Sequence, residues 1–266
     1  MRSRSFRPTV GTLAVMTELA GGQNVAVITG AGSGIGRAAS HRFASAGYAV
    51  IVADVDSRGA TAVAAELVAV GGTAKAIRVD VTDADHLRSM FQLAVQEFGR
   101  VDVVLANAGI MTGAPDYPDA SPEQVTRVVS VNLIGVMHTC QIALPHMRVN
   151  GGAIVCTAST AALSPLAGDP IYAATKAGVL HFVKSCASWS DRYGVRVNAI
   201  LPGMTDTPIV NKTGDGITPA AWLAPALDVI TMITPEEIAE AMFTLAGDAS
   251  ASGQAVTVFN PGTAPR

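Results

Sequence analysis

Short apolar runs rich in β-branched residues alternate along the chain with longer stretches in which apolar residues recur every three or four positions. The short runs are typical of buried β-strands and the longer stretches of amphipathic helices. The pattern predicts strands at residues 25–29, 49–54, 74–79, 101–106, 152–157, 195–200 and 255–259. Alternation of strands and helices favours a parallel sheet covered on both faces through right-handed crossovers. We therefore predict an α/β fold with a doubly wound, mainly parallel seven-stranded sheet.

Helix boundaries are predicted at three places. Residues 83–98 carry apolar side chains at helical spacing, and Gly99 ends the pattern. Two capping boxes, in which a hydroxyl residue is followed by proline and, three positions on, by Gln or Glu, occur at residues 121–124 and 234–237. Each box predicts the start of a further helix.

The length of 266 residues is one that a single α/β domain can reach, and 49% of the residues are hydrophobic. We expect residues 23–266 to form one domain. Residues 1–22 are expected to be a disordered N-terminal extension. They are not expected to be a secretory signal, because the apolar core of such a signal is missing there. The longest uncharged apolar stretches fall well short of the roughly 20 residues needed to cross a bilayer, so no membrane contact is expected.

Charged residues make up only 15% of the chain, against about a quarter in an average soluble domain. This shortage predicts that apolar surface is hidden between subunits, in a homodimer or homotetramer. The net charge of −3 leaves no general basic surface, so nucleic acid is not an expected partner.

The three cysteines, Cys140, Cys156 and Cys186, are odd in number and lack CxxC spacing. Reduced core cysteines of a cytoplasmic protein fit this pattern better than disulfides do. The five histidines lack the spacing of a helix-borne zinc site, so no metal is predicted.

A glycine-rich turn follows the first predicted strand. Gly30, Gly34 and Gly36 give the spacing GxxxGxG, and the next helix is expected to begin near Ile35. Glycine permits positive φ and lets a diphosphate approach the backbone, while the helix N-terminus offers free N–H groups. The turn therefore predicts a nucleotide site, with a purely structural turn as the alternative. No Lys-Ser or Lys-Thr follows, which disfavours a P-loop.

Asp54 closes the second predicted strand, 18 residues beyond Gly36, close to the spacing expected for an acid that binds an adenosine ribose. Its carboxylate would also repel a 2′-phosphate, so NAD is preferred over NADP. Arg37 and Arg58 lie nearby and keep NADP open as the alternative. Asp54 could also be an ordinary loop acid.

Tyr172 and Lys176 are four positions apart, which puts the phenol and the ammonium on one helix face. A phenol is a poor base at neutral pH, and a nearby cation favours its ionised form. The pair therefore indicates a proton-transfer site, although a surface pair is the alternative. Ser159 follows the strand at 152–157, at the sheet edge where ligands bind, and would otherwise be a turn serine. Asn132 interrupts an apolar helix face, where a buried amide needs partners.

Together these motifs resemble the short-chain dehydrogenases/reductases of the single-domain, Rossmann-fold type. The resemblance covers about residues 23–262 and rests on the glycine turn, Asn107-Ala108-Gly109, Asn132, Ser159, Tyr172-x-x-x-Lys176 and Pro202-Gly203, in that order. It implies that residues 23–266 are the catalytic domain.

The resemblance also implies roles for single residues. Tyr172 would be the general acid/base, Ser159 would polarise the substrate oxygen, and Asn132 would hold a water in the proton relay. Lys176 would bind the nicotinamide ribose and lower the pKa of Tyr172. The cofactor would be lined by Gly30, Ser33, Gly34, Ile35, Gly36, Asp54, Asp80, Val81, Asn107, Ala108, Gly109, Tyr172, Lys176, Pro202, Gly203, Thr205 and Thr207.

Two positions depart from the family pattern. Asn260-Pro261-Gly262 stands where many relatives carry Asp-Gly-Gly, near a strand that often builds the tetramer interface, so a tetramer is less secure than a dimer. Ala106 replaces a common asparagine before Asn107 and is expected to adjust sheet packing only.

The function expected from the residues and the resemblance is NAD-dependent interconversion of an alcohol and a ketone. Residues 208–233 are apolar with few charges, so they are expected to form a substrate loop over a secondary, apolar alcohol. An NADP-dependent reductase of ketoacyl type is the nearest alternative. A catalytically silent nucleotide sensor on the same scaffold is a second one.

Overall fold

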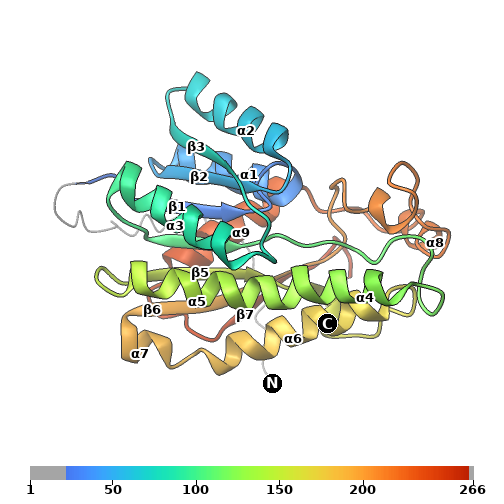
Figure 1. The fold of residues 1–266 in the computed structure, drawn as a ribbon. Coiled ribbons are helices and arrows are strands. Elements are labelled where there is room, and N and C mark those ends of the chain that lie inside the picture. Colours follow the sequence, from blue (N-terminus) through green and yellow to red (C-terminus); the bar gives the residue numbers. More distant parts are fainter. Residues whose placement is uncertain (1–21, 264–266) are drawn as a thin grey trace.

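The computed structural model describes residues 22–263, which contain a seven-stranded sheet in the order β3-β2-β1-β4-β5-β6-β7 (Figure 1). Every neighbouring pair of strands is parallel. The strands are β1 (Val25–Thr29), β2 (Ala49–Asp54), β3 (Thr73–Arg78), β4 (Val103–Ala106), β5 (Gly152–Thr157), β6 (Val195–Pro202) and β7 (Ala255–Val258). The predicted doubly wound α/β fold is confirmed. The predicted N-terminal extension lies outside the described residues, except for Gly22.

The fourth strand begins at Val103, two residues later than predicted, and Asp102 directly before it contacts the start of β1. Its backbone N–H donates to the carbonyl of Val25, and its carboxylate Oδ2 accepts from the N–H of Val25 at 2.8 Å. Arg100 donates to both oxygens of the same carboxylate. Asp102 therefore bonds to β1 through both its backbone and its side chain, and its carbonyl also accepts from the N–H of Ala153 on β5.

Helices cover both faces of the sheet, and each face has its own core (Figure 1). On β1, Val25 and Val27 pack toward one face, and Ala26 and Ile28 toward the other, as the two-residue period of a strand requires. The first face is covered by α3 (Ala84–Phe98), α5 (Gly135–Met147) and α6 (Pro170–Ser185), and the second by α1 (Gly34–Ser45), α2 (Ser57–Ala69) and α9 (Pro235–Gly247). The shorter elements are α4 (Pro122–Val129), the π-helical turn η1 (Ser130–Ile134), η2 (Thr160–Ala162), α7 (Trp189–Tyr193), η3 (Asn211–Thr213) and α8 (Ala224–Leu227).

The predicted helix boundaries agree with the structure. Both capping boxes form with reciprocal hydrogen bonds, at the starts of α4 and α9. Helix α3 ends at Gly99, which is left-handed with φ of 81°. Local sequence thus sets where these helices begin and end.

One expectation about apolar length needs correction. Elements α4, η1 and α5 run on as one helix, Pro122–Met147, whose 26 residues are long and apolar enough to cross a membrane by length and composition. A core helix of a soluble protein passes the same test. This helix packs against α3 and α6 on the face of the sheet, which is the environment of such a core helix.

The strand order puts β1 beside β4, so the chain leaves the ends of these two strands in opposite directions along the sheet. A crevice opens at such a switch point, at the carboxyl ends of the strands, and ligands of α/β proteins bind there. The predicted glycine turn and Asn107 follow these two strands directly.

Candidate functional site

The glycine turn after β1 has a shape that side chains would prevent. Gly30 and Gly34 have φ of 64° and 51°, which favours glycine. A Cβ on Gly36 would lie 2.1 Å from the carbonyl oxygen of Gly30, and a Cβ on Gly30 would lie 2.9 Å from the Cα of Ala108. The turn is therefore packed directly on the segment after β4.

Asn107 joins the ends of three strands. Its Nδ2 donates to the carbonyl of Thr29 at 3.0 Å, and its Oδ1 accepts from the hydroxyl of Thr157 at 3.1 Å. The backbone N–H of Asn107 donates in turn to the hydroxyl of Thr29 at 3.0 Å. The ends of β1, β4 and β5 are thus held in one arrangement by a single amide.

The start of α1 fits the phosphates of a dinucleotide. The side chain of Ser33 makes no capping hydrogen bond and the first turn carries no acid, whereas Ser121 and Thr234 cap α4 and α9. Free N–H groups at a helix N-terminus, next to a glycine turn with no side chains in the way, suit a diphosphate.

Asp54, at the end of β2, is fixed by two backbone groups. Its Oδ2 accepts from the N–H of Gly32 at 2.8 Å and its Oδ1 from the N–H of Asp56 at 2.9 Å. The acid is therefore tied to the glycine turn itself. Of the two arginines that kept NADP open, Arg37 is paired with Glu66 at 2.9 Å.

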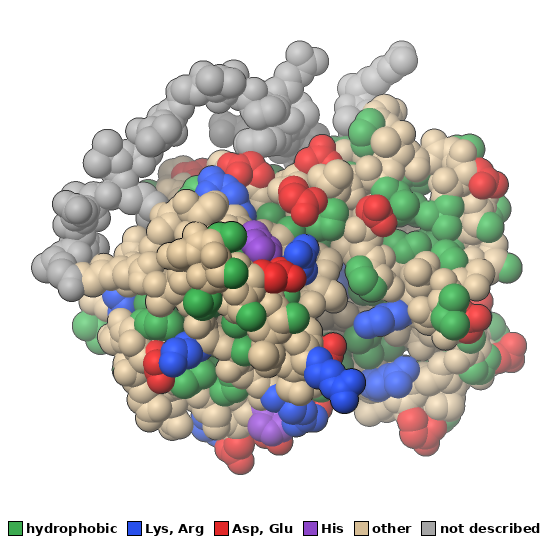
Figure 2. Space-filling view, turned by 90° about the horizontal axis from the view of Figure 1, so that it is seen from above, with side chains coloured by type: hydrophobic (Ala, Val, Ile, Leu, Met, Phe, Trp, Pro, Cys, Tyr) green, Lys and Arg blue, Asp and Glu red, His purple; other side chains and the backbone are tan. Residues whose placement is uncertain are grey.

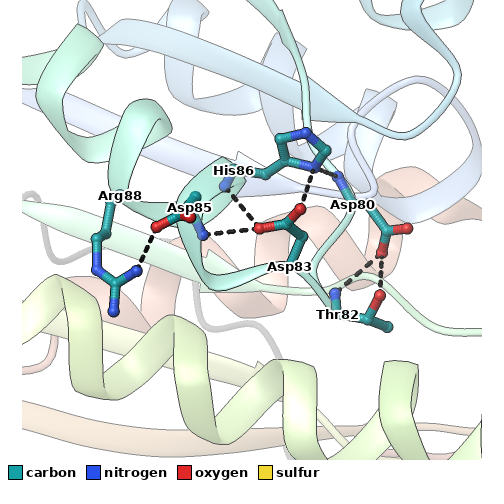
Figure 3. Close-up of polar contacts among 6 residues, drawn as sticks. All are labelled: Asp80, Thr82, Asp83, Asp85, His86 and Arg88. Carbon is teal, nitrogen blue, oxygen red and sulfur yellow. Dashed lines mark hydrogen bonds and ion pairs between the residues drawn. The ribbon is translucent and has the colours of Figure 1, made fainter.

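Asp80 follows β3 and belongs to a network of short-range contacts (Figure 3). Its Oδ1 accepts from the N–H and the hydroxyl of Thr82, at 2.9 and 2.7 Å, and these bonds lower the pKa of Asp80. Asp83 caps α3, and Figure 3 shows the ring of His86 between Asp80 and Asp83. The network thus holds Asp80, one of the residues expected to line the cofactor, in place at the end of β3.

Tyr172 and Lys176 lie one turn apart on α6, at the other end of the site. Lys176 is only 2% exposed, and its Nζ donates to the carbonyl of Thr157 at 2.8 Å. The same Nζ lies 5.4 Å from the centre of the Tyr172 ring and 3.2 Å from where a Cβ on Gly109 would lie. Burial lowers the pKa of Lys176 to about 8.

Burial also raises the pKa of Tyr172, to about 12. A hydrogen bond with Ser159 lowers this pKa, and the charge of Asp169 raises it further. Desolvation is the largest of these three effects. Tyr172 is protonated at neutral pH, which is the form that donates a proton.

Ser159 and Asn132 approach from two other elements. Ser159 precedes η2, and its Oγ accepts from the N–H of Ala161 at 3.2 Å. Asn132 lies in the π-helical turn η1 and is fully buried. Its amide is satisfied by Ile110, whose N–H donates to Oδ1 and whose carbonyl accepts from Nδ2, both at 2.8 Å. Asn132 thus fixes the segment after β4.

Almost all of the predicted site residues line one cavity of about 630 Å³. Only Gly36 and Asn132 are not in its lining: Gly36 lies against Gly30, and Asn132 bonds to Ile110. Asp54 and Asp80 line it, as do Tyr172 and the apolar side chains of Met111, Leu166, Met204, Ile209, Trp222 and Leu223.

Large apolar side chains are also exposed in the loops after β4, β5 and β6. Tyr117, Leu163, Ile217 and Val229 are each about half or more exposed. Figure 2 shows hydrophobic side chains interspersed with charged ones over this face, including the end of the molecule where α8 lies in Figure 1.

Three buried polar residues were not predicted as part of the site. Asp169 and Thr112 bond to each other beside Tyr172. Asn260 donates to the carbonyls of Met204 and Thr231 and accepts from the N–H of Met204, so it joins both ends of the loop at residues 205–233. Asp169 before Pro170 is a recognisable helix-cap pattern that could have been noticed.

Comparisons with known proteins agree with this geometry. A family model described as short chain dehydrogenase matches residues 24–217. The cis-4-hydroxycyclohexanecarboxylate dehydrogenase of Sinomonas cyclohexanicum is 39% identical, over 86% of this chain and 91% of that protein. The cyclohexanol dehydrogenase of an Acinetobacter species is 34% identical, over 85% of this chain and 89% of that protein. The solved 3-ketoacyl-(acyl-carrier-protein) reductase of Brucella melitensis, complexed with NADH, is 30% identical, with coverages of 90% and 97% and a TM-score of 0.80.

Gly36→Ala should destabilise the protein by about 1–3 kcal/mol, because the new Cβ overlaps the Gly30 carbonyl. It should also weaken NADH binding, since the turn must move. Thermal unfolding and NADH fluorescence titration measure the two effects. Gly247→Ala is the matched control, because a Cβ there meets nothing within 4 Å. Equal behaviour of the two variants would contradict the packing argument.

Proposed function

The chain belongs to the short chain dehydrogenase family and is an oxidoreductase acting on CH–OH groups; we propose that it is an NAD-dependent dehydrogenase that interconverts a secondary, apolar cyclic alcohol and its ketone. The observation that supports this most is the meeting of Tyr172, Ser159 and Lys176 in one cavity with the glycine turn. The end of the cavity at the glycine turn thus suits a cofactor, and the end at Tyr172 suits a substrate. The two must be in contact for a hydride to pass between them.

NAD is proposed over NADP because of the charges around the end of β2. The carboxylate of Asp54 would accept hydrogen bonds from a ribose and repel a 2′-phosphate. Arg37 is paired with Glu66, which leaves it less available for such a phosphate. Arg58 makes no ion pair among the described residues, so it is the one cation left near the turn that could favour NADP.

The mechanism follows from the positions of three side chains. Bound NAD would accept the hydride from the alcohol carbon. The phenolate of Tyr172 removes the hydroxyl proton, while Ser159 donates a hydrogen bond to the substrate oxygen. Lys176, held by the Thr157 carbonyl, binds the ribose and stabilises the phenolate. In reduction, protonated Tyr172 returns the proton to the carbonyl oxygen.

The substrate end of the cavity favours a compact apolar molecule. Met204, Trp222 and Leu223 line it, and Trp222 lies so close to Gly168 that a Cβ there would be 2.1 Å from the indole. The substrate loop thus packs on the segment that leads into α6. Two similar dehydrogenases are named for cyclohexane derivatives, which supports a cyclic secondary alcohol here.

A carboxylate on the substrate is favoured by two cations. Arg127 on α4 and Lys212 in η3 both line the cavity, and neither has an ion-pair partner among residues 22–263. Both side chains are exposed, so each would contribute modestly. We therefore propose a hydroxycyclohexanecarboxylate as a candidate substrate beside cyclohexanol.

A reductase of ketoacyl type is the second candidate, because the Brucella structure that carries that name superposes over 90% of this chain. Asp54 and the apolar substrate end favour the alcohol dehydrogenase. A silent nucleotide sensor is a weaker candidate, since all four predicted catalytic residues are present and bonded. A screen of cyclic alcohols and a ketoacyl thioester with both cofactors separates the three.

Assembly and location complete the proposal. We propose a homodimer or homotetramer, supported by the low charge content and by Ile134, which is 40% exposed on the long helix. We also propose a cytoplasmic location, supported by Cys140, Cys156 and Cys186, which are free and buried. A monomeric mass in sedimentation at micromolar concentration would contradict the assembly.

Tyr172→Phe should retain NADH binding and lose at least about 100-fold in kcat, because the proton donor and acceptor is removed while the ring stays. Fluorescence titration and steady-state oxidation measured at 340 nm test the two parts. Tyr193→Phe, on α7, is the matched control and should be unchanged. Turnover near the wild-type rate in Tyr172→Phe would rule out the mechanism.

Asp54→Ala should lower the ratio of kcat/KM with NAD to kcat/KM with NADP, because the ribose acceptor and the charge that repels a 2′-phosphate are both lost. Both values of kcat/KM, with NAD and with NADP, are measured with the same alcohol at saturation. An unchanged ratio would show that Asp54 does not select the cofactor.

Lys212→Gln should raise KM for 4-hydroxycyclohexanecarboxylate roughly two- to five-fold, the size of an exposed ion pair of about 0.5–1 kcal/mol. KM for cyclohexanol should not change, since it carries no charge. Lys184→Gln makes the same charge change on α6 outside the cavity lining and serves as control. If both substrates respond alike, Lys212 does not recognise the carboxylate.

A further inference from the structure

Asp169 is a buried acid that the proposed mechanism does not use. It is only 3% exposed and precedes α6, where its Oδ1 accepts from the backbone N–H of Tyr172 at 3.0 Å. The acid therefore caps the helix that carries Tyr172 and Lys176, three residues before the phenol. A cap of this kind sets where the first turn of the helix begins.

The same carboxylate also holds a second segment. Its Oδ2 accepts from the N–H of Thr112 at 2.9 Å, and its Oδ1 accepts from the Thr112 hydroxyl at 2.7 Å. Thr112 is 2% exposed and follows Ile110 and Met111, which line the cavity. One buried side chain thus joins the start of the catalytic helix to a wall of the substrate cavity, 57 positions away in the sequence.

The wall is fixed from its other sides as well. Asn132 holds Ile110 through both of its amide groups. Gln124 of the α4 capping box donates to the carbonyl of Thr112 at 3.3 Å. The wall is linked to α6 directly by the bonds of Asp169 to Thr112 and, through Asn132, by a hydrogen bond to the Thr175 hydroxyl at 3.3 Å.

We propose that Asp169 is a positioning residue, which fixes Tyr172 against the Ile110–Thr112 wall and tunes proton transfer at the phenol through its negative charge. This inference rests on the proposed role of Tyr172 as the general acid/base. A helix cap alone needs no charge, because serine or asparagine caps as well as aspartate does. The charge is therefore the property that distinguishes a tuning role from a purely structural one.

The charges around Tyr172 give the direction of the effect. Burial is the main cause that raises the pKa of Tyr172, Ser159 lowers it, and Asp169 raises it further. Lys176 faces the ring from the same helix. The other charged groups lining the cavity are Arg127 on α4, Lys212 in η3 and, at the nucleotide end, Asp54 and Asp80.

Removal of the Asp169 charge should lower the pKa of Tyr172. Alcohol oxidation needs the phenolate, so it falls as pH drops below the pKa of Tyr172. With that pKa lowered, the acidic limb of kcat/KM against pH should move to lower pH. The wild-type charge thus holds Tyr172 in the protonated form that ketone reduction needs, up to a higher pH.

The test compares two charge-free variants with one that breaks the link and keeps the charge. Asp169→Asn and Asp169→Ser both retain a capping oxygen, and Thr112→Val removes one hydrogen bond to Asp169. For each variant, kcat/KM of cyclohexanol oxidation is measured against pH at saturating NAD, with NADH binding and thermal unfolding in parallel.

Both Asp169 variants should shift the acidic limb by roughly 0.5–1 unit to lower pH. Thr112→Val should leave the limb in place and raise KM, because only the wall is loosened. If Asp169→Asn fails to fold, Asp169→Ser carries the comparison. An unmoved limb in the charge-free variants, or an equal shift in Thr112→Val, would overturn the proposal. A wild-type enzyme that oxidises no alcohol would instead refute the proposed function.

Discussion

Side chains that bond to the carbonyl groups at the strand ends hold both halves of this site in one frame. The carbonyl of Thr29 is met by the amide of Asn107, the carbonyl of Thr157 by the ammonium of Lys176, and the carbonyl of Leu105 by the hydroxyl of Thr29. A buried polar group without a partner costs about 1–3 kcal/mol. The groups that stabilise the edge of the sheet are therefore the same ones that shape the cavity.

Burial at this edge also sets the electrostatics of Tyr172 and Lys176, the proposed proton-transfer pair. It raises the pKa of Tyr172 to about 12 and lowers that of Lys176 to about 8, because desolvation disfavours the charged form of each. Opposite shifts on neighbouring groups are typical of sites that move protons. Asp169 then acts on a phenol that is already held in its protonated form.

The cavity divides into two chemically different ends. Asp54 and Asp80 lie at the end formed by β2 and β3, and both are held by backbone or hydroxyl donors. The other end is lined by apolar side chains together with Arg127 and Lys212. In the proposed function, the cofactor would bind at the first end and the apolar substrate at the second, and the two would meet at Tyr172.

By itself the sequence determined the strands, the helix caps, the glycine turn and the pairing of Tyr172 with Lys176, because each depends on neighbours a few positions apart. It left out the bonds of Asp169 to Thr112 and of Asn260 to Met204, which join segments 57 and 56 positions apart. It also left out the burial of Tyr172, which raises the pKa of its phenol to about 12. Only the tertiary structure decided these points, since burial and long-range hydrogen bonds exist only once the helices and loops have packed around the sheet edge.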